Sequence, residues 1–136
     1  MTAASERLSA DDRLEIIDLL GRYSWAFDAR DGDAYARTFT HDGVMQGPVT
    51  AIEGVEQLTG WARDYPASLA RHTISNIVIE GGADHAISKS TLVVLAGVDD
   101  EIKPVLLGEY HDSLRKTPDG WRIAHRRLVI HKSSGS

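Results

Sequence analysis

The spacing of the apolar residues changes about half-way along the chain, and this change restricts the possible folds more than any other feature. Before residue 66 they recur every three or four positions, which is typical of amphipathic helices. From residue 72 onward they form long β-branched segments separated by short turns, which is typical of strands. Because short connections make neighbouring strands antiparallel, this order predicts an α+β fold. The expected elements are helices at 10–29, 34–39 and 54–65, and strands at 44–46, 72–80, 86–98, 103–116 and 121–131.

The first helix has signals at both ends. Ser9 precedes it and Asp12 follows three residues later, a variant of the capping box. At the other end Gly32 can adopt the left-handed conformation that terminates a helix. Asp33 suits the N-cap of the second helix, and the His-Asp-Gly sequence at 41–43 suits a turn. The long helix must bury its apolar stripe, and the concave face of a curled antiparallel sheet is the surface available for it.

Length, charge and composition narrow the class of protein. The 136 residues fit one domain, with flexible ends expected at 1–8 and 132–136. A formal net charge of −5 argues against nucleic-acid binding, which needs a basic surface. The absence of cysteine excludes disulfides and thiolate nucleophiles. The longest apolar run, 92–98, is too short to span a bilayer, and the first dozen residues lack a secretory signal, so we expect a cytoplasmic protein without membrane contact.

Asp28 and His72 are the strongest candidates for chemistry. An Asp near the C-terminal end of a helix is unfavourable unless it has a cationic or hydrogen-bonding partner, which His72 can supply. An Asp that holds one imidazole nitrogen as N–H leaves the other free to act as a general base. The alternatives are a solvated carboxylate at Asp28 and a hydrogen-bonded core histidine at His72. Asn76 shares the strand face of His72 if no bulge intervenes, and it is open to the same two interpretations.

Other kinds of site find little support in the sequence. The histidines lack the spacings of common metal sites, so neither a metal nor a cofactor is expected. A glycine-rich phosphate loop and a Gly-x-Ser-x-Gly nucleophile elbow are both absent, which argues against nucleotide-dependent chemistry and covalent catalysis.

Several short motifs occur together in an order that resembles a known family. A helix ending in Tyr-x-x-x-x-Asp (23–28) comes first, and Phe39 precedes the Asp-Gly at 42–43. The later motifs are Arg-His-x-x-x-Asn (71–76), Gly-x-Tyr-x-Asp-x-Leu (108–114) and Asp-Gly-Trp-Arg-Ile-x-x-Arg (119–126). Over about residues 8–130 this combination resembles the SnoaL-like branch of the nuclear transport factor 2-like superfamily. It is most similar to the subgroup of scytalone dehydratase, hexachlorocyclohexane dehydrochlorinase and bile-acid 7α-dehydratase.

The resemblance implies a cone, in which a curved, mostly antiparallel sheet wraps around a long N-terminal helix and encloses a hydrophobic pocket, with two further helices. It also implies cofactor-independent elimination by a His–Asp dyad. His72 and Asp28 fall on the dyad positions, and Tyr23 matches the tyrosine of the bile-acid dehydratase. Phe27 stands where scytalone dehydratase has a tyrosine, which removes one hydroxyl able to polarise a carbonyl. Spacing alone puts Tyr23 and Asp28 about 140° apart around a regular helix.

The leading hypothesis is a cofactor-independent lyase (dehydratase) or isomerase that acts on a small hydrophobic cyclic substrate. His72 would take a proton, Asp28 would orient His72, and Tyr23 would donate a hydrogen bond to a developing oxygen. Among the candidates for substrate binding, the aromatic residues Trp25, Trp61 and Tyr110 are also typical of core positions. The basic candidate, Arg126, is also compatible with the sheet surface. The residues expected to bind substrate are Asn76, Trp25, Met45, Trp61, Tyr110 and Arg126.

The same fold also serves proteins without this chemistry. The alternatives are a noncatalytic small-molecule-binding or assembly module, a polyketide-cyclase-like enzyme, and the small subunit of a ring-hydroxylating oxygenase. The resemblance also implies a homodimer or homotrimer. Apolar residues at alternating strand positions, such as Val93 and Leu107, permit it by making both sheet faces apolar.

Overall fold

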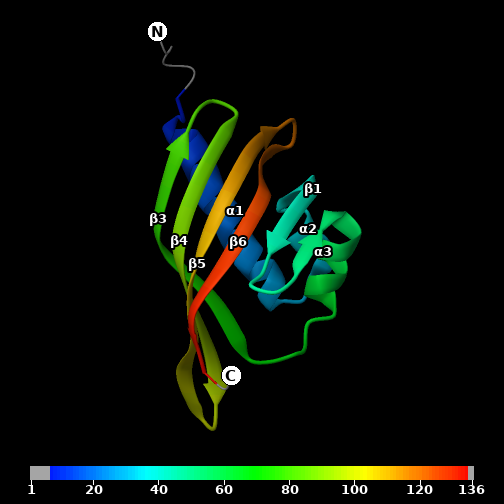
Figure 1. The fold of residues 1–136 in the computed structure, drawn as a ribbon, viewed down its shortest axis with the longest axis vertical. Helices are drawn as coiled ribbons and strands as arrows, with labels where there is room; N and C mark the ends of the chain where they lie inside the picture. Colours follow the sequence, from blue (N-terminus) through cyan, green and yellow to red (C-terminus); the bar gives the residue numbers. More distant parts are fainter. Residues whose placement is uncertain (1–6, 135–136) are drawn as a thin grey trace.

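A computed structural model describes residues 7–134 as an α+β fold with a curved six-stranded sheet and three helices (Figure 1). Within the described sheet, strand order is β2-β1-β6-β5-β4-β3, and only β1 and β6 run parallel. The predicted α+β fold and its four long antiparallel strands are therefore confirmed. The elements are α1 (Ala10–Asp28), α2 (Gly32–Ala36), β1 (Phe39–Gln46), β2 (Ala51–Glu53), α3 (Gly54–Arg63), β3 (Ala70–Gly81), β4 (His85–Val98), β5 (Glu101–Thr117) and β6 (Gly120–Ser133).

Helix α1 lies across one face of the long strands β3 to β6, and the core forms between them (Figure 1). Its buried side chains recur at helical spacing, as the sequence predicts. Burying each large apolar side chain contributes about 1.5–3 kcal/mol. The main core residues from the helix are Ile16, Leu19, Leu20, Tyr23 and Phe27, and those from the sheet are Met45, Leu92, Tyr110, Leu114, Trp121 and Ile123.

The predicted capping box at the start of α1 is confirmed. The Ser9 hydroxyl accepts a hydrogen bond from the Asp12 backbone N–H at 3.0 Å, and the Asp12 carboxylate accepts one from the Ser9 backbone at 3.3 Å. Asp12 also accepts from the indole N–H of Trp121 at 2.9 Å and from the ammonium of Lys116 at 3.0 Å. The carboxylate therefore fastens the helix to β5 and β6. The Trp121 hydrogen bond, followed by that of Lys116, holds the pKa of Asp12 well below its ordinary value.

This lowered pKa predicts an acid-sensitive contribution to stability. The unfolded chain takes up a proton at Asp12 near pH 3.8, whereas the native protein does so only at lower pH. The free energy of unfolding therefore decreases as the pH falls below about 4. Asp12→Asn should lower stability at neutral pH by about 1.5–3 kcal/mol, since it weakens charge-assisted hydrogen bonds. Urea unfolding at several pH values should show a shallower acid dependence in Asp12→Asn; equal dependence in both proteins would contradict this role.

The connection from α1 to α2 differs from the prediction. The N-cap of α2 is Asp31 rather than Asp33, since the Asp31 carboxylate accepts from the Ala34 N–H at 3.0 Å. The left-handed residue after α1 is Arg30, with φ of 59°, rather than Gly32. Gly32 serves a different purpose, because a Cβ there would lie 2.4 Å from the carbonyl oxygen of Thr59. The absence of a side chain lets α2 approach α3 closely.

Strand β1 is longer than predicted. The expected strand at 44–46 is only its end, and the expected turn at 41–43 lies inside it. The register against β6 shifts between Phe39 and Val44, so this segment forms a bulge. A Cβ at Gly43 would lie 2.7 Å from the Cβ of Phe39, so the bulge requires glycine. The short strand β2 was not predicted.

Part of the segments expected to be flexible, 1–8 and 132–136, takes part in the fold. Residues 1–6 and 135–136 lie outside the described residues. Arg7 forms a β-bridge with Gly82, and Leu8 is 9% exposed and packs in the core. Lys132 and Ser133 continue β6 and pair with β5. Among residues 7–134, helices that are long and apolar enough to cross a bilayer are absent.

Candidate active site

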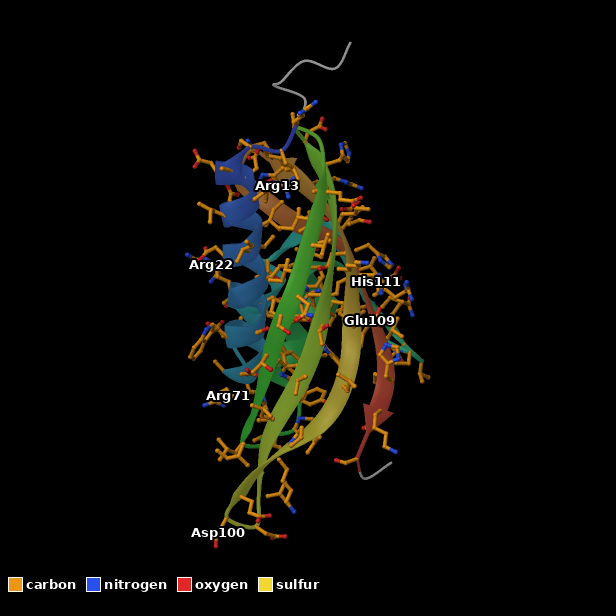
Figure 2. The ribbon with its side chains drawn as sticks, turned by 90° about the vertical axis from the view of Figure 1, so that its left-hand side faces the viewer. Arg13, Arg22, Arg71, Asp100, Glu109 and His111 are labelled. Carbon is orange, nitrogen blue, oxygen red and sulfur yellow. The ribbon has the colours of Figure 1, made fainter. Side chains whose placement is uncertain are left out.

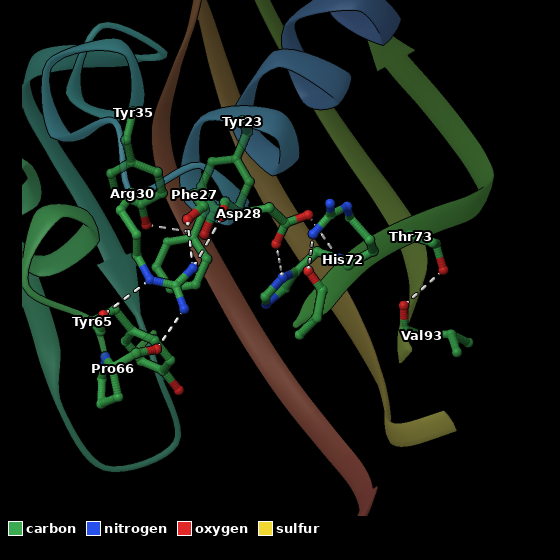
Figure 3. A network of polar contacts seen from close by, with 12 residues as sticks. Tyr23, Phe27, Asp28, Arg30, Tyr35, Tyr65, Pro66, His72, Thr73 and Val93 are labelled. Atoms are coloured by element: carbon green, nitrogen blue, oxygen red, sulfur yellow. Dashed lines mark hydrogen bonds and ion pairs between the residues drawn. The ribbon is translucent and has the colours of Figure 1, made fainter. Parts of the chain in front are cut away.

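Asp28 and His72 meet where the end of α1 packs against the beginning of β3. The ring Nδ1 of His72 lies 2.7 Å from Oδ1 of Asp28, and the backbone N–H of His72 donates to Oδ2 at 3.0 Å (Figure 3). Both carboxylate oxygens of Asp28 thus form hydrogen bonds with His72, and this fixes the imidazole relative to the helix. The side chains are 8% exposed for Asp28 and 19% exposed for His72. The pair is therefore largely withdrawn from water, yet the ring still has access to it.

The pairing sets the chemistry of the imidazole. A carboxylate accepts hydrogen bonds, so in the neutral ring the proton resides on Nδ1 and the lone pair on Nε2. Nε2 is then free to accept a proton, and the carboxylate stabilises the imidazolium that forms.

A cleft of about 260 Å³ borders the pair. The edge of Phe27 meets the His72 ring with centroids 5.0 Å apart, and Phe27 contacts Tyr65 at 4.9 Å. The ring centroids of Tyr65 and Trp61 are in turn 5.3 Å apart, so a row of aromatic rings leads from the dyad to the surface. The opposite wall comes from β4 and β5. Its apolar residues are Val94, Ala96, Val105 and Leu106.

Arg30 connects the end of α1 to the loop between α3 and β3. Its guanidinium donates to the carbonyl oxygens of Phe27 at 3.4 Å and Asp28 at 3.1 Å, and it also donates to the carbonyls of Tyr65 and Pro66 (Figure 3). A cation at this position interacts favourably with the negative, C-terminal end of the helix dipole. The same contacts hold the loop beside the cleft.

Loss of the Arg30 side chain should loosen that loop. Arg30→Gly retains the left-handed backbone without strain but removes every guanidinium hydrogen bond. Amide hydrogen exchange between Asp64 and Ala70 should accelerate about tenfold, because loop opening then breaks fewer contacts. Asp100→Gly is a matched control at another left-handed position, with φ of 63°, and should leave this exchange unchanged. Equal exchange in Arg30→Gly and the parent protein would show that Arg30 does not hold the loop.

A second polar cluster lies in the core. The hydroxyls of Tyr23 and Tyr35 are 3.1 Å apart, and the Arg126 guanidinium lies over the rings of Tyr23 and Tyr110, at 4.3 and 3.7 Å from their centroids. Arg126 also pairs with Asp112 through two hydrogen bonds of 2.7 and 2.9 Å, and both side chains are 0% exposed. Nη1 of Arg126 is buried without a hydrogen-bond partner.

The burial of this cluster determines its charges. Burial by itself lowers the pKa of Arg126, but the adjacent Asp112 carboxylate outweighs it, so the pKa lies above its ordinary value and the guanidinium stays charged. Burial, followed by the neighbouring Tyr23, raises the pKa of Tyr35 and of Tyr110 well above the ordinary value. Those two phenols therefore remain protonated hydrogen-bond donors.

The structure brings only part of the predicted site together. Tyr23 is buried, and neither it nor Arg126 or Tyr110 lines the cleft at His72. Trp61 does not line the cleft but packs against Tyr65, which does. The indole N–H of Trp61 is buried without a hydrogen-bond partner. Met45 packs in the core.

Asn76 and Trp25 lie elsewhere. Asn76 is exposed and has φ of 56°, and the register of β3 against β4 shifts between Ser75 and Val78. This bulge breaks the alternation that would have placed Asn76 on the His72 face, so that expectation is corrected. Trp25 is 74% exposed and lines a different groove.

Several residues of the site were missed from the sequence. Phe27 was noted only for the hydroxyl it lacks, and Arg30 and Tyr65 were not identified; Asp112 of the core cluster was missed as well. The cation of Arg30, two residues after the helix-terminal Asp28, is a signal that could have indicated a helix cap. Among the described residues, groups of three or more His, Cys, Asp or Glu side chains that could hold a metal ion are absent.

Comparisons with known proteins agree with this fold. A family model for the SnoaL-like domain matches residues 8–127. A solved structure of a Mycobacterium tuberculosis protein of unknown function superposes with a TM-score of 0.85 at 30% identity, covering 91% of this chain and 74% of that chain. A Novosphingobium aromaticivorans protein provisionally assigned as a scytalone dehydratase has a TM-score of 0.79 at 20% identity, covering 94% of this chain and 92% of that one, a likeness of fold alone. The chlorobenzene dioxygenase subunit beta of Cupriavidus sp. (strain PS12) is 32% identical over 80 residues, which span 55% of this chain and 42% of that subunit.

Proposed function

The chain belongs to the SnoaL-like domain family, and from this premise we propose that it is a cofactor-independent lyase or isomerase with His72 as general base. The observation that carries the proposal is the 2.7 Å contact of His72 Nδ1 with Asp28 at the wall of the cleft. The aromatic and aliphatic walls favour a small hydrophobic, cyclic substrate.

In the proposed reaction Nε2 of His72 takes a proton from a carbon next to a carbonyl. In an elimination the electron pair of that C–H bond forms a C=C double bond and the leaving group departs with the pair of the bond that breaks. The imidazolium of His72 then gives its proton to the leaving group or to water, which restores the neutral base. In an isomerisation His72 returns the proton to another carbon. Asp28 is a positioning residue, because it acts through the imidazole rather than on the substrate.

The hydroxyls of Tyr23 and Tyr35 do not line the cleft, so the proposal gives them no direct contact with the substrate. Since burial raises the pKa of Tyr35, its hydroxyl stays protonated and shares a hydrogen bond with Tyr23. Phe27 packs against both His72 and Tyr35, with ring centroids 5.0 and 5.5 Å apart, so it connects the dyad to the hydroxyl pair.

The test is to incubate the protein in D₂O with cyclic β-hydroxy ketones and cyclic enones and to follow each compound by proton NMR. Loss of water, migration of the double bond or exchange of the α-proton is expected with at least one compound, and it should disappear in His72→Gln. If compounds bind but none reacts or exchanges, the catalytic proposal fails and a noncatalytic binding module is favoured.

A second candidate function has a specific observation in its favour. The identity to a dioxygenase beta subunit supports a noncatalytic role in holding a partner chain. Purifying this chain without a partner chain distinguishes the two candidate functions. A homo-oligomer that remains folded and monodisperse without another chain agrees with the first proposal, whereas aggregation relieved by a larger oxygenase subunit agrees with the second.

A further inference from the structure

A second hollow lies where α1, the α2 region and the start of β6 meet. We call it the arginine groove and define it by Arg22, Trp25, Asp31, Arg37 and Arg122. Its volume is about 570 Å³, within the range of small-molecule sites. It shares no lining residue with the cleft at His72. It is therefore a candidate site that the proposed chemistry does not use.

The groove concentrates positive charge on a chain whose formal net charge is −5. Arg22 points away from the sheet and is paired with Asp18 at 2.6 Å (Figure 2). Arg122 donates to the carbonyl oxygen of Trp121 at 2.8 Å. Among residues 7–134, neither Arg37 nor Arg122 takes part in an ion pair. Two guanidinium groups thus line one hollow without a direct ion pair, although the Glu15 carboxylate lies near Arg122 beside Gly120.

The carboxylates near Arg37 and Arg122 indicate which side of these two arginines is more favourable for an anion. Arg37 and Arg122 also line an adjacent hollow, but Asp33 and Asp119 line it too and offset the positive charge there. The Trp25 side is lined by three arginines and a single aspartate, Asp31, which keeps its charge while it accepts from the Ala34 N–H at 3.0 Å. The positive potential is consequently larger beside Trp25.

Trp25 adds a second, independent feature. Its side chain is 74% exposed on the wall of the groove, although a large indole normally gains by burial. An exposed indole next to guanidinium groups offers a face for stacking beside donors suited to anionic oxygens. We propose that the arginine groove binds a small planar molecule that carries a carboxylate or phosphate group.

The test follows the indole N–H of Trp25 in ¹H–¹⁵N NMR spectra, with the signal assigned by its loss in Trp25→Phe. Benzoate and phenyl phosphate are titrated separately, which distinguishes a carboxylate from a phosphate ligand. A saturable shift of the Trp25 signal with at least one of them is expected. Arg37→Gln and Arg122→Gln should each weaken binding by about tenfold or more, since each removes charge-assisted hydrogen bonds.

Controls make the proposal refutable. Arg63→Gln removes the same charge from an exposed ion pair outside the groove and should leave binding unchanged. Equal binding of the neutral benzyl alcohol would refute a role for the arginines, and equal binding of inorganic phosphate would refute a role for Trp25. The proposal also fails if neither anion gives a saturable shift, or if both arginine variants bind as the parent protein does. None of these results depends on His72.

Discussion

Asp112→Ala is expected to lower the free energy of unfolding by about 3–5 kcal/mol, the largest stability effect that the structure predicts. The substitution leaves the Arg126 guanidinium buried without a counter-ion. Asp112 provides both acceptors for Arg126, at 2.7 and 2.9 Å, and both side chains are 0% exposed. The rings of Tyr23 and Tyr110 contact the guanidinium but cannot neutralise its charge.

Urea denaturation measures this cost against two controls. Asp18→Ala breaks an exposed Asp–Arg pair of similar length, 2.6 Å, and should cost far less, because water screens an exposed pair. The double variant Asp112→Leu/Arg126→Met removes both buried charges and should be more stable than Asp112→Ala alone. If Asp112→Ala costs no more than Asp18→Ala, the buried charge is not balanced by Asp112.

His72→Gln is expected to reduce turnover by about 10²–10⁴-fold in the proton-exchange assay, because it removes the proposed general base. Asp28→Asn should also reduce it, since an amide cannot stabilise the imidazolium in the same way. It should cost about 1–3 kcal/mol of stability, because one of the two His72 donors loses its acceptor. Both variants should retain the circular dichroism spectrum of the parent protein.

The chain contains a matched control for this prediction. His85 Nδ1 also lies 2.7 Å from an aspartate, Asp84, but their side chains are 72% and 76% exposed. His85→Gln should leave turnover unchanged, because that exposed pair lacks the burial of His72 and Asp28. If His85→Gln reduces turnover as much as His72→Gln does, the assigned site is wrong.

The regular part of the fold could be predicted because local signals determine it. The capping box at Ser9 and Asp12, and the long β-branched segments, depend on neighbouring residues alone. The unfavourable position of Asp28 at a helix C-terminus suggested His72 as its partner, and the family resemblance strengthened that pairing, since spacing gave the two residues no special geometry. Their contact depends on how α1 packs against β3.

Bulges explain several of the errors. Thr117 pairs with Gly120, so a strict count back from that turn would set Asp112 opposite His125. A bulge between Ser113 and Leu114 moves the partner of Asp112 to Arg126, which buries a residue that also fitted the sheet surface. The bulge in β3 likewise turns Asn76 outward. A shift of one residue reverses the face of every side chain beyond it, and such shifts are not visible in the pattern of apolar residues.

The most direct test of the proposed chemistry is the tautomer of His72. Long-range ¹H–¹⁵N NMR at a pH where the ring is neutral reports which ring nitrogen carries the proton. We predict a protonated Nδ1 and a bare Nε2 in the parent protein, and a return toward the Nε2–H form in Asp28→Ala, which removes the acceptor. A His72 ring that carries its proton on Nε2 in the parent protein would contradict the account, because that nitrogen could not then act as the base.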